Sequence, residues 1–131
     1  MTALPLPSAI KDACYTAFRV LIGFLFLWHG AQKVGLMDRE AAEGFMFFIG
    51  CAELIGGLAI MAGFLTAWAA LGGLIIMVGA YVQHASGADA GLLPIENRGE
   101  LALVYLASFL CLIALGSGRW SIDRCCLAKR K

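Results

Sequence analysis

The sequence predicts an all-α fold, an integral membrane four-helix bundle with up-down-up-down connections. Of its 131 residues, 61% are hydrophobic and 15% are charged, whereas soluble domains are roughly 45–50% apolar and about 25% charged. Four apolar stretches approach the roughly 20 residues that a bilayer-spanning helix needs. Two of the three junctions between these stretches are rich in charged residues, which fits loops outside the membrane.

The four apolar stretches are taken in chain order within a single domain over 1–131. The predicted spans are 14–33, 45–64, 65–84 and 100–117. Only Gly63 and Thr66 favour a turn between the second and third spans, so this turn must be very tight. One unbroken helix through both spans would be about twice as long as the bilayer is thick, which argues against it.

Lysine and arginine set the expected direction of the spans, because they concentrate on the cytoplasmic side. Four spans place both termini on one side. That side carries Lys11, Arg19, Arg119, Arg124, Lys129, Arg130 and Lys131, and the other side carries Lys33, Arg39 and Arg98. The bias predicts that both termini are cytoplasmic and that 118–131 form a cytoplasmic tail. The net charge of +1 gives no general attraction to nucleic acid.

Small residues favour close helix packing in lipid. The first span carries a stripe of Arg19, Gly23, Phe26, Gly30 and Lys33, and Gly50, Gly56 and Gly57 share a face of the second span with Glu53. These glycines are interpreted as packing surfaces between helices.

Glu53 lies near the middle of the second span, where an ionised carboxylate costs on the order of 2.5–3.5 kcal/mol. It must therefore be protonated, pair with a cation or line a wet cavity. Arg19 is the predicted partner, because it lies about 6 Å from the middle of the first span and has a long side chain. His29 lies about 9 Å to the other side of that middle. The Arg19–Glu53 pair would either form a polar site or hold two helices in register.

A second polar set is expected near the extracytoplasmic surface. Its members are His29, Gln32, Lys33, Tyr81, His84 and Glu100. His29 and Lys33 share a helix face, and His84 could pair with Glu100. The set is interpreted either as interfacial anchors or as a quinone head-group pocket, a proton relay or the entrance of a solute path. Two histidines without a third ligand at a suitable spacing predict no metal site.

Three pieces of the chain resemble the DoxX family of small four-helix membrane proteins. They are "FR…GFLFLWHGAQKVG", "ELIGGLAIMAGFLTAWAA" and "GELALVYLASFLCLIALGSGRWSID", and they cover Phe18 to Asp123 in the family's order. The resemblance implies an inner-membrane protein, and it places Arg19, His29, Gln32, Lys33, Glu53 and Glu100 at the family's polar positions. Ala67 stands where the family often has an arginine after the threonine.

The family name comes from a subunit of an archaeal thiosulfate:quinone oxidoreductase, so the resemblance implies a quinone and an oxidoreductase partner. Three functions follow as hypotheses. The first is a membrane subunit or accessory of a quinone-linked oxidoreductase, in which His29, Lys33 and Glu100 serve the quinone. The second is a non-enzymatic scaffold or assembly protein held together by Arg19–Glu53. The third is a small-solute or proton transporter, which would require an oligomer because four short helices leave little room for a path.

Overall fold

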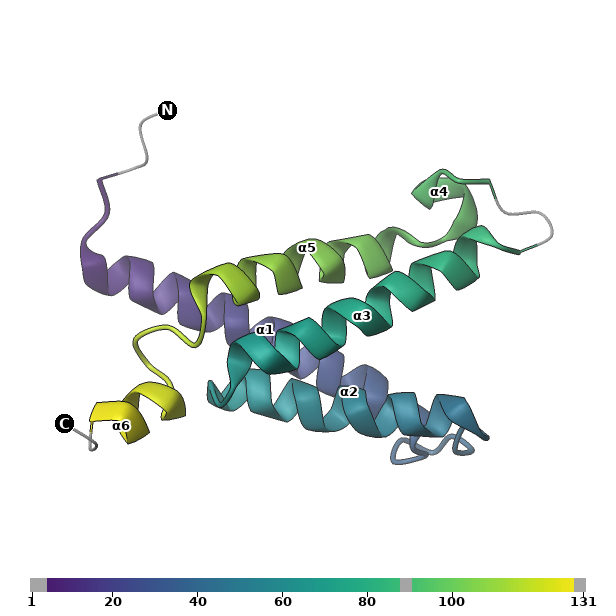
Figure 1. The fold of residues 1–131 in the computed structure, drawn as a ribbon, viewed down its shortest axis with the longest axis horizontal. Coiled ribbons are helices and arrows are strands. Elements are labelled where there is room, and N and C mark those ends of the chain that lie inside the picture. Colours follow the sequence, from purple (N-terminus) through teal and green to yellow (C-terminus); the bar gives the residue numbers. More distant parts are fainter. Residues whose placement is uncertain (1–4, 88–90, 129–131) are drawn as a thin grey trace.

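The computed structural model describes residues 5–87 and 91–128, which contain helices and no strand (Figure 1). Its helices are α1 (Ser8–Lys33), α2 (Phe45–Ala62), α3 (Thr66–Ala85), α4 (Pro94–Asn97), α5 (Glu100–Leu115) and α6 (Ile122–Ala128). The all-α class is confirmed. The predicted first span begins at residue 14, but α1 begins at Ser8, and the short helices α4 and α6 lie outside the predicted spans.

The four long helices alternate in direction and form two pairs, α1 with α2 and α3 with α5. Contact between α2 and α3 is less extensive, and contact between α1 and α5 is slight. Figure 1 shows the start of α1, the α2–α3 turn and α6 at one end, here called the termini end. The α1–α2 connection (34–44) and α4 lie at the other end, here called the loop end.

Two of these helices have the length and composition of membrane spans. The mean hydropathy reaches 2.0 in α2 and 1.5 in α3. Helix α5 is also apolar but has 16 residues, fewer than the roughly 20 that normally cross a bilayer. The membrane placement of α1 and α5 therefore stays a prediction.

Glycines bring α1 and α2 into backbone contact. A Cβ atom added to Gly57 would lie 2.6 Å from the backbone oxygen of Gly23, and one added to Gly30 would lie 2.6 Å from that of Gly50. Neither contact leaves room for a side chain, because both neighbours are backbone atoms. The predicted role of these glycines in helix packing is confirmed.

The α2–α3 turn is as tight as predicted. Gly63, immediately after α2, has a left-handed backbone (φ 70°), and Leu65 is also left-handed (φ 47°) immediately before α3 begins. Glycine adopts this conformation without steric cost. The reversal separates two helices instead of continuing one long helix.

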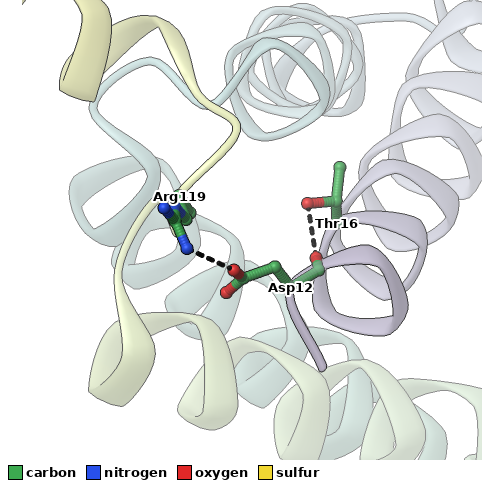
Figure 2. Close-up of polar contacts among 3 residues, drawn as sticks. All are labelled: Asp12, Thr16 and Arg119. Carbon is green, nitrogen blue, oxygen red and sulfur yellow. Dashed lines mark hydrogen bonds and ion pairs between the residues drawn. The ribbon is translucent and has the colours of Figure 1, made fainter. Parts of the chain in front are cut away.

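The termini end is closed by the segment between α5 and α6. Asp123 accepts a hydrogen bond from the backbone N–H of Leu65 (3.1 Å) and one from the hydroxyl of Ser117 (2.8 Å). At the surface, Nη1 of Arg119 lies 3.3 Å from Oδ2 of Asp12 (Figure 2). The backbone oxygen of Asp12 accepts a hydrogen bond from the hydroxyl of Thr16. These contacts tie the chain after α5 to α1 and to the α2–α3 turn.

Candidate functional site: a polar cavity at the loop end

A cavity of about 320 Å³ opens between α1, α2, α3 and α5. It is lined by His29, Lys33, Glu53, Met77, Ala80, His84, Arg98, Leu101, Ala102 and Tyr105. Its size lies at the lower end of the roughly 300–1,000 Å³ range of ligand pockets. Six of the ten lining residues have polar or charged side chains that can donate or accept hydrogen bonds.

An ion pair forms one wall of this cavity. Nζ of Lys33, the last residue of α1, lies 2.6 Å from Oε1 of Glu53 in the middle of α2. The Glu53 side chain is fully buried, whereas the Lys33 side chain is 31% exposed. Gly50 makes this reach possible, because a Cβ atom there would lie 2.6 Å from Cβ of Lys33. The missing side chain of Gly50 therefore lets the lysine stem lie flat against α2.

The second oxygen of Glu53 has no hydrogen-bond partner. Oε2 is buried and no described residue donates to it. A buried acceptor without a donor costs about 1–3 kcal/mol, and more when it is charged. Because Glu53 also lines the cavity, a molecule in the cavity that donates a hydrogen bond to Oε2 would recover this cost.

His29 and Tyr105 also line the cavity. Their rings meet edge to face with centroids 5.7 Å apart, a favourable aromatic geometry. Tyr105 is 3% exposed and is held by Phe26 and Phe109, whose ring centroids lie 6.0 and 5.8 Å from its own. The aromatic core between the helix pairs thus fixes the position of a phenol at the cavity.

The family of the protein follows from comparison with known sequences. A family model described as DoxX matches residues 15–85, more than half of the chain. The chain belongs to the DoxX family. The match runs from residue 15 within α1 to the end of α3 and includes His29, Lys33, Glu53 and His84. It ends before Arg98 and Tyr105.

The chain is also similar to two further proteins, one of which is described as a membrane protein. An uncharacterized membrane protein of Mycobacterium tuberculosis is 34% identical over 125 residues, covering 81% of this chain and 77% of that protein. An uncharacterized protein of Haemophilus influenzae is 29% identical over 113 residues, covering 80% and 84%. No solved structure matches the chain.

This DoxX protein does not form the predicted Arg19–Glu53 pair. Glu53 lies between Gly50 and Gly57, which contact Gly30 and Gly23 of α1, so it faces the second half of α1. Arg19 lies beyond Gly23, where its guanidinium is 2.8 Å from the Cβ position of Gly63 at the end of α2. The prediction was wrong because it placed the centres of the two spans at the same depth. The register set by the glycines brings Lys33 to Glu53 instead.

Arg19 has its own partners at the termini end. Its two terminal nitrogens donate to the backbone oxygens of Ser117 and Trp120, the latter at 2.8 Å. The side chain is 2% exposed, and its Nε has no partner. The hydroxyl of Tyr15, one helical turn away, donates to the backbone oxygen of Gly116. Arg19 and Tyr15 thus hold the chain that follows α5 against α1.

The predicted outer set divides into two groups. His29, Lys33 and His84 line the cavity, whereas Gln32, Tyr81 and Glu100 are not among its lining residues. The hydroxyl of Tyr81 donates to the backbone oxygen of Leu92 at 2.8 Å, and its ring packs on Gly99. Among the described residues, no ion pair joins His84 to Glu100, and both side chains are exposed.

Two polar residues of the cavity, Arg98 and Tyr105, are absent from the predicted set. Arg98 was counted only as a loop charge, and it lines the cavity from the left-handed position (φ 59°) immediately after α4. Tyr105 was treated as part of an uncharged span. Its hydroxyl in the middle of an apolar helix was the available signal. No group of three or more potential metal ligands occurs among the residues that the structure describes.

Proposed function

We propose that this DoxX-family membrane protein binds the head group of a quinone in the loop-end cavity, as the membrane subunit of a quinone-linked oxidoreductase system. One observation carries the proposal: Oε2 of Glu53 is fully buried, lacks a partner and belongs to a cavity with hydrogen-bond donors around it. A quinone head group combines an apolar ring with oxygens that accept hydrogen bonds when oxidised and donate them when reduced. The mixed lining of the cavity suits both forms.

Different cavity residues can bind the oxidised and the reduced form of the quinone. The ammonium of Lys33 and the ring N–H of His29 can donate to a carbonyl oxygen, as can the hydroxyl of Tyr105. Oε2 of Glu53 can accept from a hydroxyl and carry its proton. Met77, Leu101 and Ala102 offer apolar contact to the ring. A quinone bound there would take up two electrons and two protons, and we assign the electrons to a partner redox protein.

The direct test is to isolate the protein from its own membrane in mild detergent and analyse the extract for quinones. Binding of a decyl-tailed benzoquinone in its reduced, hydroquinone form, whose hydroxyl can donate to Oε2, is then compared between wild type, Glu53→Gln and Glu43→Gln. Glu43 is an exposed carboxylate outside the cavity and serves as the matched control. We expect Glu53→Gln to weaken binding by about tenfold or more, with Glu43→Gln unchanged.

The proposal fails if no quinone accompanies the native protein and the decyl-tailed benzoquinone does not bind. It also fails if Glu53→Gln and wild type bind this quinone equally well. A scaffold without a ligand would instead lose stability on Glu53→Gln and bind no quinone in any form.

We further propose that both termini are cytoplasmic and that the cavity opens near the extracytoplasmic surface of a bacterial-type inner membrane. Lys11, Arg119 and Arg124 lie at the termini end, and Lys33, Arg39 and Arg98 lie at the loop end. Lys129, Arg130 and Lys131 lie outside the described residues. A green fluorescent protein fused after Lys131 should fluoresce, and alkaline phosphatase inserted within 34–44 should be active. The opposite pattern would reverse the orientation.

A further inference from the structure

A second, apolar depression runs along the outside of α2 and α3. Its loop-end part has a volume of about 480 Å³ and is lined mainly by Phe45, Met46, Ile49, Ile75, Gly79 and Val82. Its termini-end part has a volume of about 400 Å³ and is lined by residues that include Ile55, Ala59, Trp68 and Gly72. Ile76 borders both parts. Together they form what is called here the α2–α3 groove.

The groove exists because α3 leans away from α2 towards α5. Figure 1 shows α2 and α3 diverging from their turn at the termini end, and α3 packs more extensively on α5 than on α2. Small residues deepen it, since a Cβ atom added to Gly72 or Gly79 would meet nothing within 4 Å. The lining residues extend along nearly the whole of α2, a helix about 27 Å long.

The groove adjoins the polar cavity. Lys33 and Ala80 line both the cavity and the loop-end part of the groove. Lys33 and Gln83 are the polar side chains of the groove, and both lie in its loop-end part. From that point towards the termini end the lining is apolar. A molecule that occupies both spaces must therefore have a polar head and a long apolar tail.

We propose that the α2–α3 groove holds the apolar tail of the quinone whose head group occupies the cavity. This inference rests on the proposed function and extends it from the head group to the whole ligand. Lys33 lies where the cavity meets the groove, with its ammonium directed to Glu53 and its stem against Gly50. The tail follows α3 past Gly79 and Ile76 towards Trp68. The tail leaves lipid or detergent, which is already apolar, so its gain in the groove comes from close packing contacts.

The experiment compares two benzoquinones that share one head group, one without a tail and one with a decyl tail. Gly79→Phe fills the groove, and the open space at Gly79 lets the variant fold. Val78→Phe, on the neighbouring exposed face of α3 and outside the groove, is the matched control. Affinities are compared between variants for the same ligand, so that partitioning of the tail into detergent cancels.

We expect Gly79→Phe to weaken binding of the decyl-tailed quinone by about tenfold and that of the tail-less quinone by less than about twofold. Val78→Phe should change neither. Equal effects of Gly79→Phe and Val78→Phe on the decyl-tailed quinone would overturn the inference while leaving the head-group site intact. Failure of both quinones to bind the wild-type protein would overturn the proposed function itself.

A fluorescence measurement tests the same path without filling the groove. Trp68 lines the termini-end part and is 72% exposed, and the chain has three tryptophans. In a variant that combines Trp28→Phe and Trp120→Phe, Trp68 is the one remaining tryptophan and gives all of the tryptophan fluorescence. A quinone with a bromine at the end of its tail should quench Trp68, and excess unbrominated quinone should reverse the quenching. Quenching that excess quinone leaves unchanged would place the tail in the detergent and overturn the inference.

Discussion

Both ends of this molecule bury a charged side chain, and the two side chains differ in their partners and in their contact with a cavity. At the termini end, Arg19 donates to two backbone oxygens and lines none of the cavities described above. At the loop end, Glu53 has one partner, Lys33, and leaves a buried oxygen open to a polar cavity. The comparison teaches that burial of a charge does not identify a site. Arg19 also leaves a buried atom, Nε, without a partner, so the feature that distinguishes Glu53 is the polar cavity beside its unpaired oxygen.

The largest effect is expected from breaking the termini end. Arg19→Met leaves the backbone oxygens of Ser117 and Trp120 without their donor, so the free energy of unfolding should fall by roughly 2–4 kcal/mol. Thermal unfolding in detergent measures the change. Arg124→Met, an exposed arginine of α6, is the control and should unfold like wild type. If Arg19→Met matches that control, Arg19 does not hold this end together.

The next largest effect concerns the Lys33–Glu53 pair. Lys33→Met leaves a fully buried carboxylate without a cation, and Glu53→Gln removes that carboxylate. Combining the two should therefore cost less than the sum of the single changes, with a coupling of roughly 1–3 kcal/mol. The coupling free energy is obtained by measuring the unfolding of wild type, the two single variants and the double variant. A value near zero would mean that the pair is loose and that the loop end resembles an ordinary surface.

A smaller effect is expected at the phenol of the cavity. Tyr105→Phe keeps the ring against Phe26 and Phe109 but removes one donor, so quinone affinity should fall by about 0.5–1.5 kcal/mol with little change in stability. Tyr81→Phe is the matched control, since its hydroxyl donates to Leu92 and lies outside the cavity lining. Equal affinities in the two variants would remove Tyr105 from the site.

The smallest effect is expected at the surface of the termini end. Arg119→Ala breaks the 3.3 Å pair with Asp12, in which the side chains are 57% and 27% exposed. Exposed pairs contribute about 0–1 kcal/mol and are screened by salt, so the melting temperature should barely move at high salt. A loss as large as that of Arg19→Met would mean that this pair, and not the buried guanidinium, closes the end.

Sequence reasoning located the ingredients of the site more reliably than their pairing. His29, Lys33 and His84 were predicted to lie together because the ends of successive spans meet at one surface, and all three line the cavity. Glu53 was recognised from its cost in an apolar helix. Its partner was mistaken, since the choice between Arg19 and Lys33 depends on a shift of α1 along α2. That shift is decided by the backbone contacts of Gly23 and Gly30, which hydropathy does not measure.

By itself the sequence determined the helical class, the tight reversal at Gly63 and the family, because hydropathy, turn residues and local motifs are properties of short segments. Only the tertiary structure decided that α3 leans towards α5, that Tyr105 reaches the cavity and that one oxygen of Glu53 is left without a donor. These features depend on how side chains from separate helices fill or fail to fill shared space. That balance of close contact and empty volume is settled when the helices pack together.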